Sequence, residues 1–268
     1  MNIIYYNPFS GLADSVPPII LQSFVILMVG LVIIGTLIDI IHKKNVKYFF
    51  QNAKKAKKSA TRELGAGERI SIVAKTVVYD IGTTSELGAG KRRVAHLLGM
   101  YGTILFWLGS VIMVFCYSAP NSNTPIAWPI IWHVGAIMTI LGGSWFWFFL
   151  RVDVYSEAQP WYRIIKADLF VLALIATSLF GLIWSYLQSL NLQDRWDDKV
   201  FLVLYIVSNL VLFGGVYWSK FAHMFYKPGA AIQKNLAEAD GSRDNLPPPA
   251  DAPEQFGLGI KREEPKHY

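Results

Sequence analysis

Histidine is the residue type with the most chemistry to offer in this 268-residue sequence, where it occurs five times. His96 stands at the start of one long hydrophobic stretch, just after a run of basic residues. His223 stands at the end of another such stretch and also has lysines beside it. If both stretches are membrane helices, the two imidazoles lie at the same depth on different helices. Two opposed neutral imidazoles are the axial ligands that a low-spin haem b iron requires.

Other roles stay open for these histidines. A single histidine at a membrane interface commonly caps a helix or faces lipid, and the pair is also compatible with a purely structural role. Gly99 and Thr103 lie one and two turns beyond His96, and Gly102 adjoins them. Such small residues leave space for a flat macrocycle, but they equally allow two helices to pack closely.

Two further histidines lie in or beside hydrophobic stretches. His42 ends the first stretch at the same basic end, so it is a substitute ligand there. His133 lies a little over one turn inside the third stretch, toward the opposite end. It is a candidate contact for a quinone carbonyl or for proton exchange, or else a hydrogen-bonded structural residue with Ser208 and Asn209 as neighbours.

The elements that position these residues are hydrophobic helices. The chain is 53% hydrophobic and 16% charged, whereas soluble domains carry nearer a quarter charged residues. A bilayer core of about 30 Å takes about 20 apolar residues in a helix. The sequence therefore predicts an all-α integral membrane protein with about five spans: 17–41, 94–117, 128–150, 167–187 and 200–222.

Lysine and arginine counts predict the orientation, because these residues concentrate in cytoplasmic loops. Residues 1–16 contain neither, while residues 43–93 contain thirteen. We therefore expect the N-terminus outside, the C-terminus in the cytoplasm and a multi-pass protein of the cell inner membrane. The net charge of +6 is explained by this topology and by contact with membrane lipid, so nucleic acid is not an expected partner.

Three regions follow along the chain: an outer segment 1–16, a helix bundle 17–235 that includes the basic loop 43–93, and a Pro-rich cytoplasmic tail 236–268. Residues 68–81 of the loop have apolar side chains at helical spacing, which predicts a short amphipathic helix on the membrane or on a partner. The tail is too polar to fold alone, so we expect it to be disordered or to become ordered on a partner.

Several chemistries are excluded. The single Cys116 rules out a cysteine-ligated iron–sulfur cluster within the chain. The sequence contains no Cys-x-x-Cys, no His-Glu-x-x-His and no Walker loop. None of these motifs therefore assigns a catalytic activity to the chain.

Three motifs resemble those of the respiratory nitrate reductase gamma-like cytochrome b subunits. They are Lys-Thr-Val-Val-Tyr-Asp-Ile at 75–81, the basic approach to His96 at 91–102, and Lys-Phe-Ala-His followed by a proline at 220–228. The long basic first loop and the Pro-rich tail look most like the membrane anchors of dissimilatory adenylylsulfate reductase. Relatives serve heterodisulfide reductase and dissimilatory sulfite reductase complexes.

The resemblance implies a non-catalytic or quinone-reacting subunit of an oxidoreductase complex. This electron-transfer subunit would link the quinone pool to a cytoplasmic flavin and iron–sulfur heterodimer, the enzyme that interconverts adenylylsulfate with sulfite and AMP. It implies one haem b on His96 and His223, because Phe106 and Tyr205 occupy the places of the family's second pair. A cofactor-free anchor for the same enzyme is the alternative. A solute transporter is disfavoured by the odd number of spans.

Overall fold

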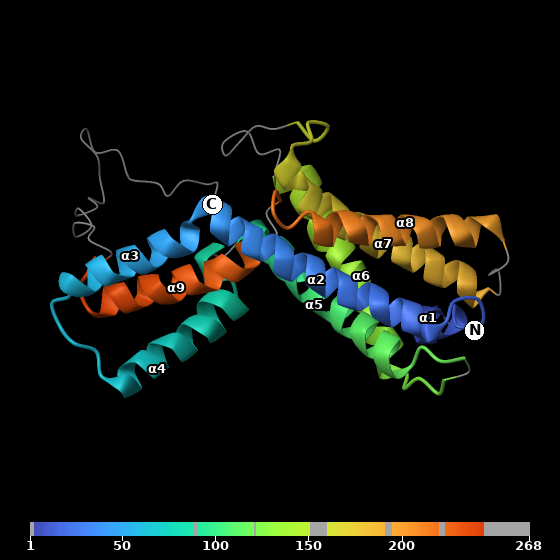
Figure 1. The fold of residues 1–268 in the computed structure, drawn as a ribbon, viewed down its shortest axis with the longest axis horizontal. Coiled ribbons are helices and arrows are strands. Elements are labelled where there is room, and N and C mark those ends of the chain that lie inside the picture. Colours follow the sequence, from blue (N-terminus) through green and yellow to red (C-terminus); the bar gives the residue numbers. More distant parts are fainter. Residues whose placement is uncertain are drawn as a thin grey trace. The chain divides into compact units, whose positions relative to one another are not determined.

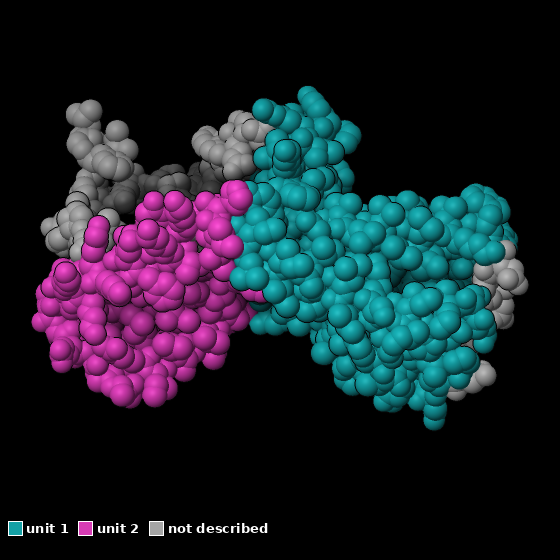
Figure 2. All heavy atoms as spheres, in the orientation of Figure 1, with its two compact units in different colours: residues 1–39, 91–222 teal, residues 40–90, 223–268 magenta. Residues whose placement is uncertain are grey.

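The computed structural model describes residues 3–87, 90–120, 122–150, 160–190, 195–219 and 223–243. Regular structure in this part of the chain is entirely helical (Figure 1). The chain forms two compact units (Figure 2), each built from two separate stretches of sequence. Unit 1 contains residues 1–39 and 91–222, and unit 2 contains residues 40–90 and 223–268. The predicted bundle 17–235 is thus divided between two bodies.

Four helices in the described part of the chain are long and apolar enough to cross a membrane. Their hydrophobic runs predicted them to within a few residues, so the prediction of an all-helical fold with long apolar helices is confirmed for four of the five predicted spans. They are α2 (Pro18–Lys43), α5 (Lys91–Cys116), α6 (Ala127–Trp145) with its π-helical continuation η4 (Phe146–Leu150), and α7 (Leu169–Ser189) after the short η5 (Lys166–Asp168).

The fifth hydrophobic stretch differs from its prediction. Helix α8 runs from Trp196 to Gly214 and does not continue to Ala222. Two consecutive glycines, Gly214 and Gly215, stand where it ends, and glycine disfavours the helix interior while it favours helix termini. Its first turn carries Asp197, Asp198 and Lys199, so its apolar part is shorter than that of the other four.

Helix α2 presents most of its apolar side chains outward. Ile26, Ile34 and Ile41 are exposed to 62%, 57% and 71%, and only three of its residues are buried. Exposed aliphatic side chains over such a length are unfavourable in water, but in a bilayer they contact apolar lipid chains. The exposure pattern is therefore that of a lipid-facing helix.

Helices α5 and α6 pack through glycines that allow their backbones to approach closely. A Cβ added at Gly102 would lie 2.6 Å from the backbone nitrogen of Thr139, and one added at Gly109 would lie 2.9 Å from Cβ of Trp132. Two glycines of α6, Gly135 and Gly142, likewise lie against the backbone of α5, and a Cβ added at either would collide with it. We call this contact the glycine seam; small residues commonly mediate helix packing in membranes.

The N-terminal segment packs into unit 1. It contains η1 (Ile3–Tyr5) and the short α1 (Pro8–Gly11). The Asn7 side chain caps α1 by accepting a hydrogen bond from the Phe9 amide, and it donates to the Tyr117 carbonyl and to Thr124 Oγ1. Phe9 is buried, with only 4% of its surface exposed. The segment expected on the outer side of the membrane therefore packs against one end of the helices of unit 1.

Unit 2 combines the basic loop with the last described helix. It contains α3 (Asn45–Lys58), α4 (Ala66–Lys75), the π-helix η2 (Thr76–Gly82), η3 (Ser85–Leu87) and α9 (His223–Ala239). The amphipathic helix expected at 68–81 is confirmed as α4 and η2. Helix α9 contacts α3, α4 and η2, so it is the centre of this unit.

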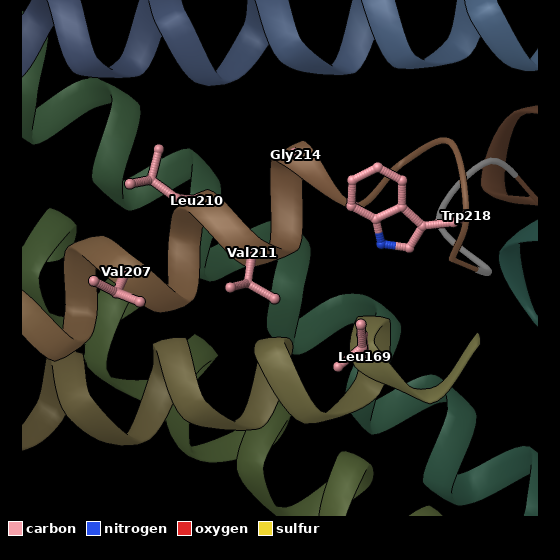
Figure 3. Close-up of a pocket in the computed structure, with 7 residues that line it drawn as sticks. Leu169, Val207, Leu210, Val211, Gly214 and Trp218 are labelled. Carbon is pink, nitrogen blue, oxygen red and sulfur yellow. The ribbon is translucent and has the colours of Figure 1, made fainter. Parts of the chain in front are cut away.

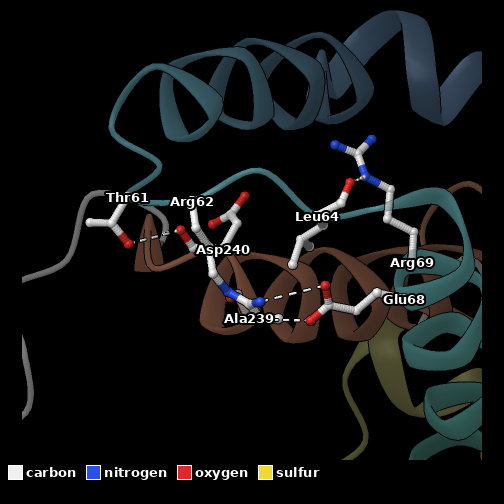
Figure 4. Close-up of polar contacts among 7 residues, drawn as sticks. All are labelled: Thr61, Arg62, Leu64, Glu68, Arg69, Ala239 and Asp240. Carbon is white, nitrogen blue, oxygen red and sulfur yellow. Dashed lines mark hydrogen bonds and ion pairs between the residues drawn. The ribbon is translucent and has the colours of Figure 1, made fainter.

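The beginning of the predicted disordered tail is helical. Residues 236–239 are the last turn of α9, where Ala237 is 1% exposed. Main-chain amides of Thr61 and Arg62 donate to the carbonyl of Asp240, and Arg62 Nε donates to that of Ala239 at 2.7 Å (Figure 4). These bonds satisfy carbonyls that a helix end otherwise leaves without partners. Tail residues 244–268 lie outside the described part.

Candidate functional site

The two predicted haem ligands belong to different units. His96 lies in the second turn of α5, in unit 1, and its side chain is exposed. His223 is the first residue of α9, in unit 2, rather than the last residue of a membrane helix. The helix that was expected to carry His223 ends nine residues earlier, at Gly214. The pairing of the two imidazoles stays a prediction.

The sequence left two roles open for the small residues beside His96, namely space for a macrocycle and close helix packing, and the structure separates them. Gly102 is part of the glycine seam, and Thr103 Oγ1 meets Thr139 Oγ1 of α6 at 3.4 Å, so both serve helix packing. Gly99 differs, because a Cβ placed on it would meet no atom within 4 Å. His96 and Gly99 lie one turn apart on α5, and the helix face at Gly99 is open in the described part of the chain. The donor type and this open face fit a haem, which would take one axial imidazole from His96.

The region of the family's second ligand pair is filled by aromatic side chains. Phe106 packs on Trp132 with ring centroids 5.0 Å apart, and Tyr205 stacks on Trp184 at 5.6 Å. Phe9 contacts both tryptophans edge-on, at 6.0 and 5.7 Å. Phe106 and Tyr205 are thus members of a packed core, the aromatic cluster, that joins α5, α6, α7 and α8 to the N-terminal segment.

His133 is buried in unit 1, with 2% of its surface exposed. Its Nδ1 lies 2.7 Å from the Pro129 carbonyl, one turn earlier in α6, and its Nε2 lies 3.0 Å from Ser185 Oγ of α7. A carbonyl only accepts, so Nδ1 carries the proton and Ser185 donates to Nε2. The expected neighbours Ser208 and Asn209 instead donate to the Tyr205 carbonyl within α8. Both ring nitrogens thus have protein partners, Nδ1 within α6 and Nε2 on α7, which favours the structural role over a quinone contact.

A groove of about 410 Å³ lies between α7 and α8 (Figure 3). Apolar side chains, two glycines and the indole of Trp218 line it, and none of the predicted site histidines is among them. Such a surface offers van der Waals contact to an apolar chain but no ligand for a metal. In the described part of the chain, His, Cys, Asp and Glu form no group of three or more that could hold a metal ion.

A polar brace fixes the π-helix η2. Asn235 Nδ2 of α9 donates to Thr76 Oγ1 at 2.8 Å and to Asp80 Oδ2 at 2.6 Å, while Ser85 Oγ donates to Asp80 Oδ1 at 2.6 Å. Hydrogen bonds from Ser85 and Asn235, with Lys234 and Lys75 nearby, hold the pKa of the Asp80 carboxyl below its usual range. π-Helices occur often at functional sites and need such support because their geometry is unfavourable. We refer to these four residues, Thr76, Asp80, Ser85 and Asn235, as the brace.

The opposite face of this segment is apolar and exposed. The exposed fractions are 69% for Ile70, 46% for Val77, 61% for Val78 and 60% for Tyr79. This apolar stripe covers α4 and η2, and the brace fixes the η2 half of it. Large exposed apolar groups in one place commonly mark an interaction surface.

Sequence reasoning missed the brace, the N-terminal closure and the partner of His133. The Asn7-Pro8 pair is a recognisable N-cap signal, with proline at the first helical position. Asn235 and Ser185 carry no comparable signal, since each acts through a partner more than fifty residues away in the chain.

Comparison of the chain with models of protein families, with curated proteins and with solved structures finds no match. The resemblance seen in residues 75–81, 91–102 and 220–228 therefore stays a prediction, and the geometry of the two units is the basis for a function.

Proposed function

We propose that this chain is the membrane-anchoring subunit of a quinone-linked redox complex and that the apolar stripe of unit 2 binds the soluble enzyme. The observation that carries the proposal is the braced stripe, from Ile70 to Tyr79, on a folded unit outside the four apolar helices. An anchor needs such a rigid extramembrane surface. A small-solute transporter does not, because its substrate site lies within the membrane helices.

The partner suggested by the sequence motifs is a cytoplasmic flavin and iron–sulfur heterodimer acting on adenylylsulfate. In this arrangement α8 is a fifth span, the N-terminus lies outside, and unit 2 lies in the cytoplasm. The positive-inside rule supports this orientation, since lysines of α3 directly follow α2. Reporter fusions after Lys58 and after Asp240 should both report the cytoplasm, and an external signal from either excludes the orientation.

Docking is tested by changing the stripe without unfolding unit 2. The double variant Val77→Ser, Val78→Ser should lose the co-purifying enzyme while the chain is still inserted in the membrane, because the apolar contact area is lost. The matched control changes Tyr48 and Phe50 to serine, since both are exposed aromatic residues on α3. Full recovery of the enzyme with the stripe variant would exclude the stripe as its binding surface.

The tail is tested separately. A deletion that begins at residue 236 would remove Ala237 and Asp240 from unit 2, and would therefore confuse docking with folding. Deletion of 244–268 leaves all described contacts of α9 in place. We expect it to weaken recovery of the enzyme at moderate salt.

One haem b on His96 and His223 is a second candidate feature of the same subunit. His96 lies in unit 1 and His223 in unit 2, so one haem on both would take a ligand from each stretch of sequence that carries a matching motif. Such a haem would supply one-electron transfer between the docked enzyme and quinone. A pyridine haemochrome assay should give about one haem per chain, and His96→Ala or His223→Ala should each abolish it.

Gly99→Ala sharpens the haem test. The added methyl group meets no protein atom, so it should leave the fold intact and yet disturb a ring that lies over this face. A shifted haem spectrum in a stable Gly99→Ala protein supports the site. The absence of haem from the well-folded wild type would leave the cofactor-free anchor.

A further inference from the structure

Helix α3 begins at the membrane boundary. α2 has 26 residues, or about 39 Å at 1.5 Å per residue, which exceeds a hydrocarbon core of about 30 Å. Its last residue is Lys43, and one residue alone, Lys44 in the left-handed conformation, separates it from α3. The first turn of α3 therefore lies at the level of the lipid headgroups, whatever direction the helix then takes.

One face of α3 packs within unit 2. Val46, Phe49, Ala53 and Ala56 recur at intervals of three and four residues, and Ala56 is 1% exposed. α3 contacts α9. This face is therefore committed to the fold, and the other faces of the helix are left for contacts outside the unit.

The face opposite is basic. At about 100° per residue, Lys47, Lys54 and Lys58 fall within about 40° of one another, on the side away from the packed face. All three are exposed, as are Lys55 and Lys57. Helix α3 contains no acidic residue, and in the described part of the chain none of its lysines forms an ion pair. Within the described residues, these charges are therefore available for a contact outside the helix.

Aromatic side chains flank this basic face at the membrane-proximal end. Tyr48 and Phe50 belong to the first two turns, and they are exposed to 56% and 59%. On the helical wheel they lie on the two sides of the lysine row. Aromatic residues beside lysines are characteristic of helices that lie at a lipid headgroup layer.

We propose that Lys47, Lys54 and Lys58 of α3 bind the phosphates of anionic phospholipids in the leaflet where α2 ends, with Tyr48 and Phe50 at the headgroup boundary. Lipid is favoured over an acidic protein because the covalent link to α2 holds the start of this face, with Lys47, Tyr48 and Phe50, at the bilayer surface. The site is separate from the docking function, which uses the apolar stripe of α4 and η2.

The test uses the full-length chain in nanodiscs of phosphatidylcholine, with or without phosphatidylglycerol, and follows amide hydrogen exchange of residues 45–58. Anionic lipid should slow exchange in α3, on the order of fivefold for each lysine engaged. The effect should disappear at high salt, because exposed charges are screened. The triple variant Lys47→Gln, Lys54→Gln, Lys58→Gln should show no difference between the two lipids.

The matched control removes three exposed lysines elsewhere in unit 2, by Lys75→Gln, Lys227→Gln and Lys234→Gln, and should keep the lipid effect. The α3 variant should still bind the soluble enzyme, which separates this inference from the docking proposal. Equal exchange of wild-type α3 in both lipids overturns the proposal. So does slowing that requires an added acidic protein, which would make α3 a protein-binding face.

Discussion

Nδ2 of Asn235 lies 2.6 Å from Oδ2 of Asp80 and 2.8 Å from Oγ1 of Thr76. One amide thus connects α9 to both ends of the same π-helical turn, across more than 150 residues of sequence. The apolar stripe depends on this connection for its shape, because Val77, Val78 and Tyr79 lie between Thr76 and Asp80.

Asn235→Ala should loosen η2. The change removes two hydrogen bonds, one of them to a carboxylate, for a loss of about 1–3 kcal/mol. Amide exchange of residues 76–82 should accelerate, while that of α5 and α6 stays unchanged. Asn52→Ala, at an exposed position of α3, is the control and should have no effect. Unchanged exchange in η2 after Asn235→Ala would show that the brace does not support the turn.

The lowered pKa of Asp80 predicts how the stability of unit 2 changes with pH. Because its pKa is lowered in the folded state, its contribution to stability is fully present above the unfolded value of about 3.9. The contribution is lost as the pH falls through the folded pKa. The difference in η2 exchange between wild type and Asp80→Asn should therefore be largest above about pH 5 and shrink on acidification. A difference that grows toward low pH contradicts this assignment.

The glycine seam predicts opposite results for two neighbouring glycines. Gly142→Ala places a methyl group against the backbone of Gly99 and Ala95, so α5 and α6 must separate, at a cost of about 1–3 kcal/mol. Gly99→Ala meets no protein atom and should leave stability within about 0.5 kcal/mol. Apparent melting temperatures of both variants in detergent make the comparison. Equal losses of stability in the two variants would show that α5 and α6 do not pack through Gly142.

His133 and Ser185 should be energetically coupled. Ser185→Ala removes one neutral hydrogen bond and should cost about 0.5–1.5 kcal/mol. His133→Ala should cost more, since it also opens a cavity beside Trp132. The double variant should lose less than the sum of the two, which a double-mutant cycle measures. Strict additivity would mean that the bond contributes nothing.

The hydrophobic runs predicted four helices well because a bilayer imposes both their length and their type. The predicted end of α8 was wrong because the residues after Gly214–Gly215 are still apolar. Composition alone cannot distinguish a short turn such as 215–219 from a continuing helix. Periodicity predicted the amphipathic helix with Ile70 and Val77 on its apolar face, but Val78 and Tyr79 could be assigned to the exposed stripe only from the structure.

Single residues were harder to assign. Gly99 and Gly102 look equivalent in the sequence. In the structure, α6 occupies the space where a Cβ on Gly102 would lie, whereas the corresponding space at Gly99 is open. His133 was recognised as buried or functional, and only the position of Ser185 on α7 favours the structural role. In both cases the deciding partner is on another helix, where spacing along the chain carries no information.

The bonds between Thr61–Arg62 and the end of α9 have a consequence for biosynthesis. Helices α3 and α4 leave the ribosome long before α9, since residues 83–222 are translated in between. Until then Ala56 and Thr76, both 1% exposed in the finished chain, have no α9 to cover them. A chain that stops early therefore leaves these two positions without the helix that packs against them. Unit 2 can therefore be completed only after the whole of unit 1 has been translated.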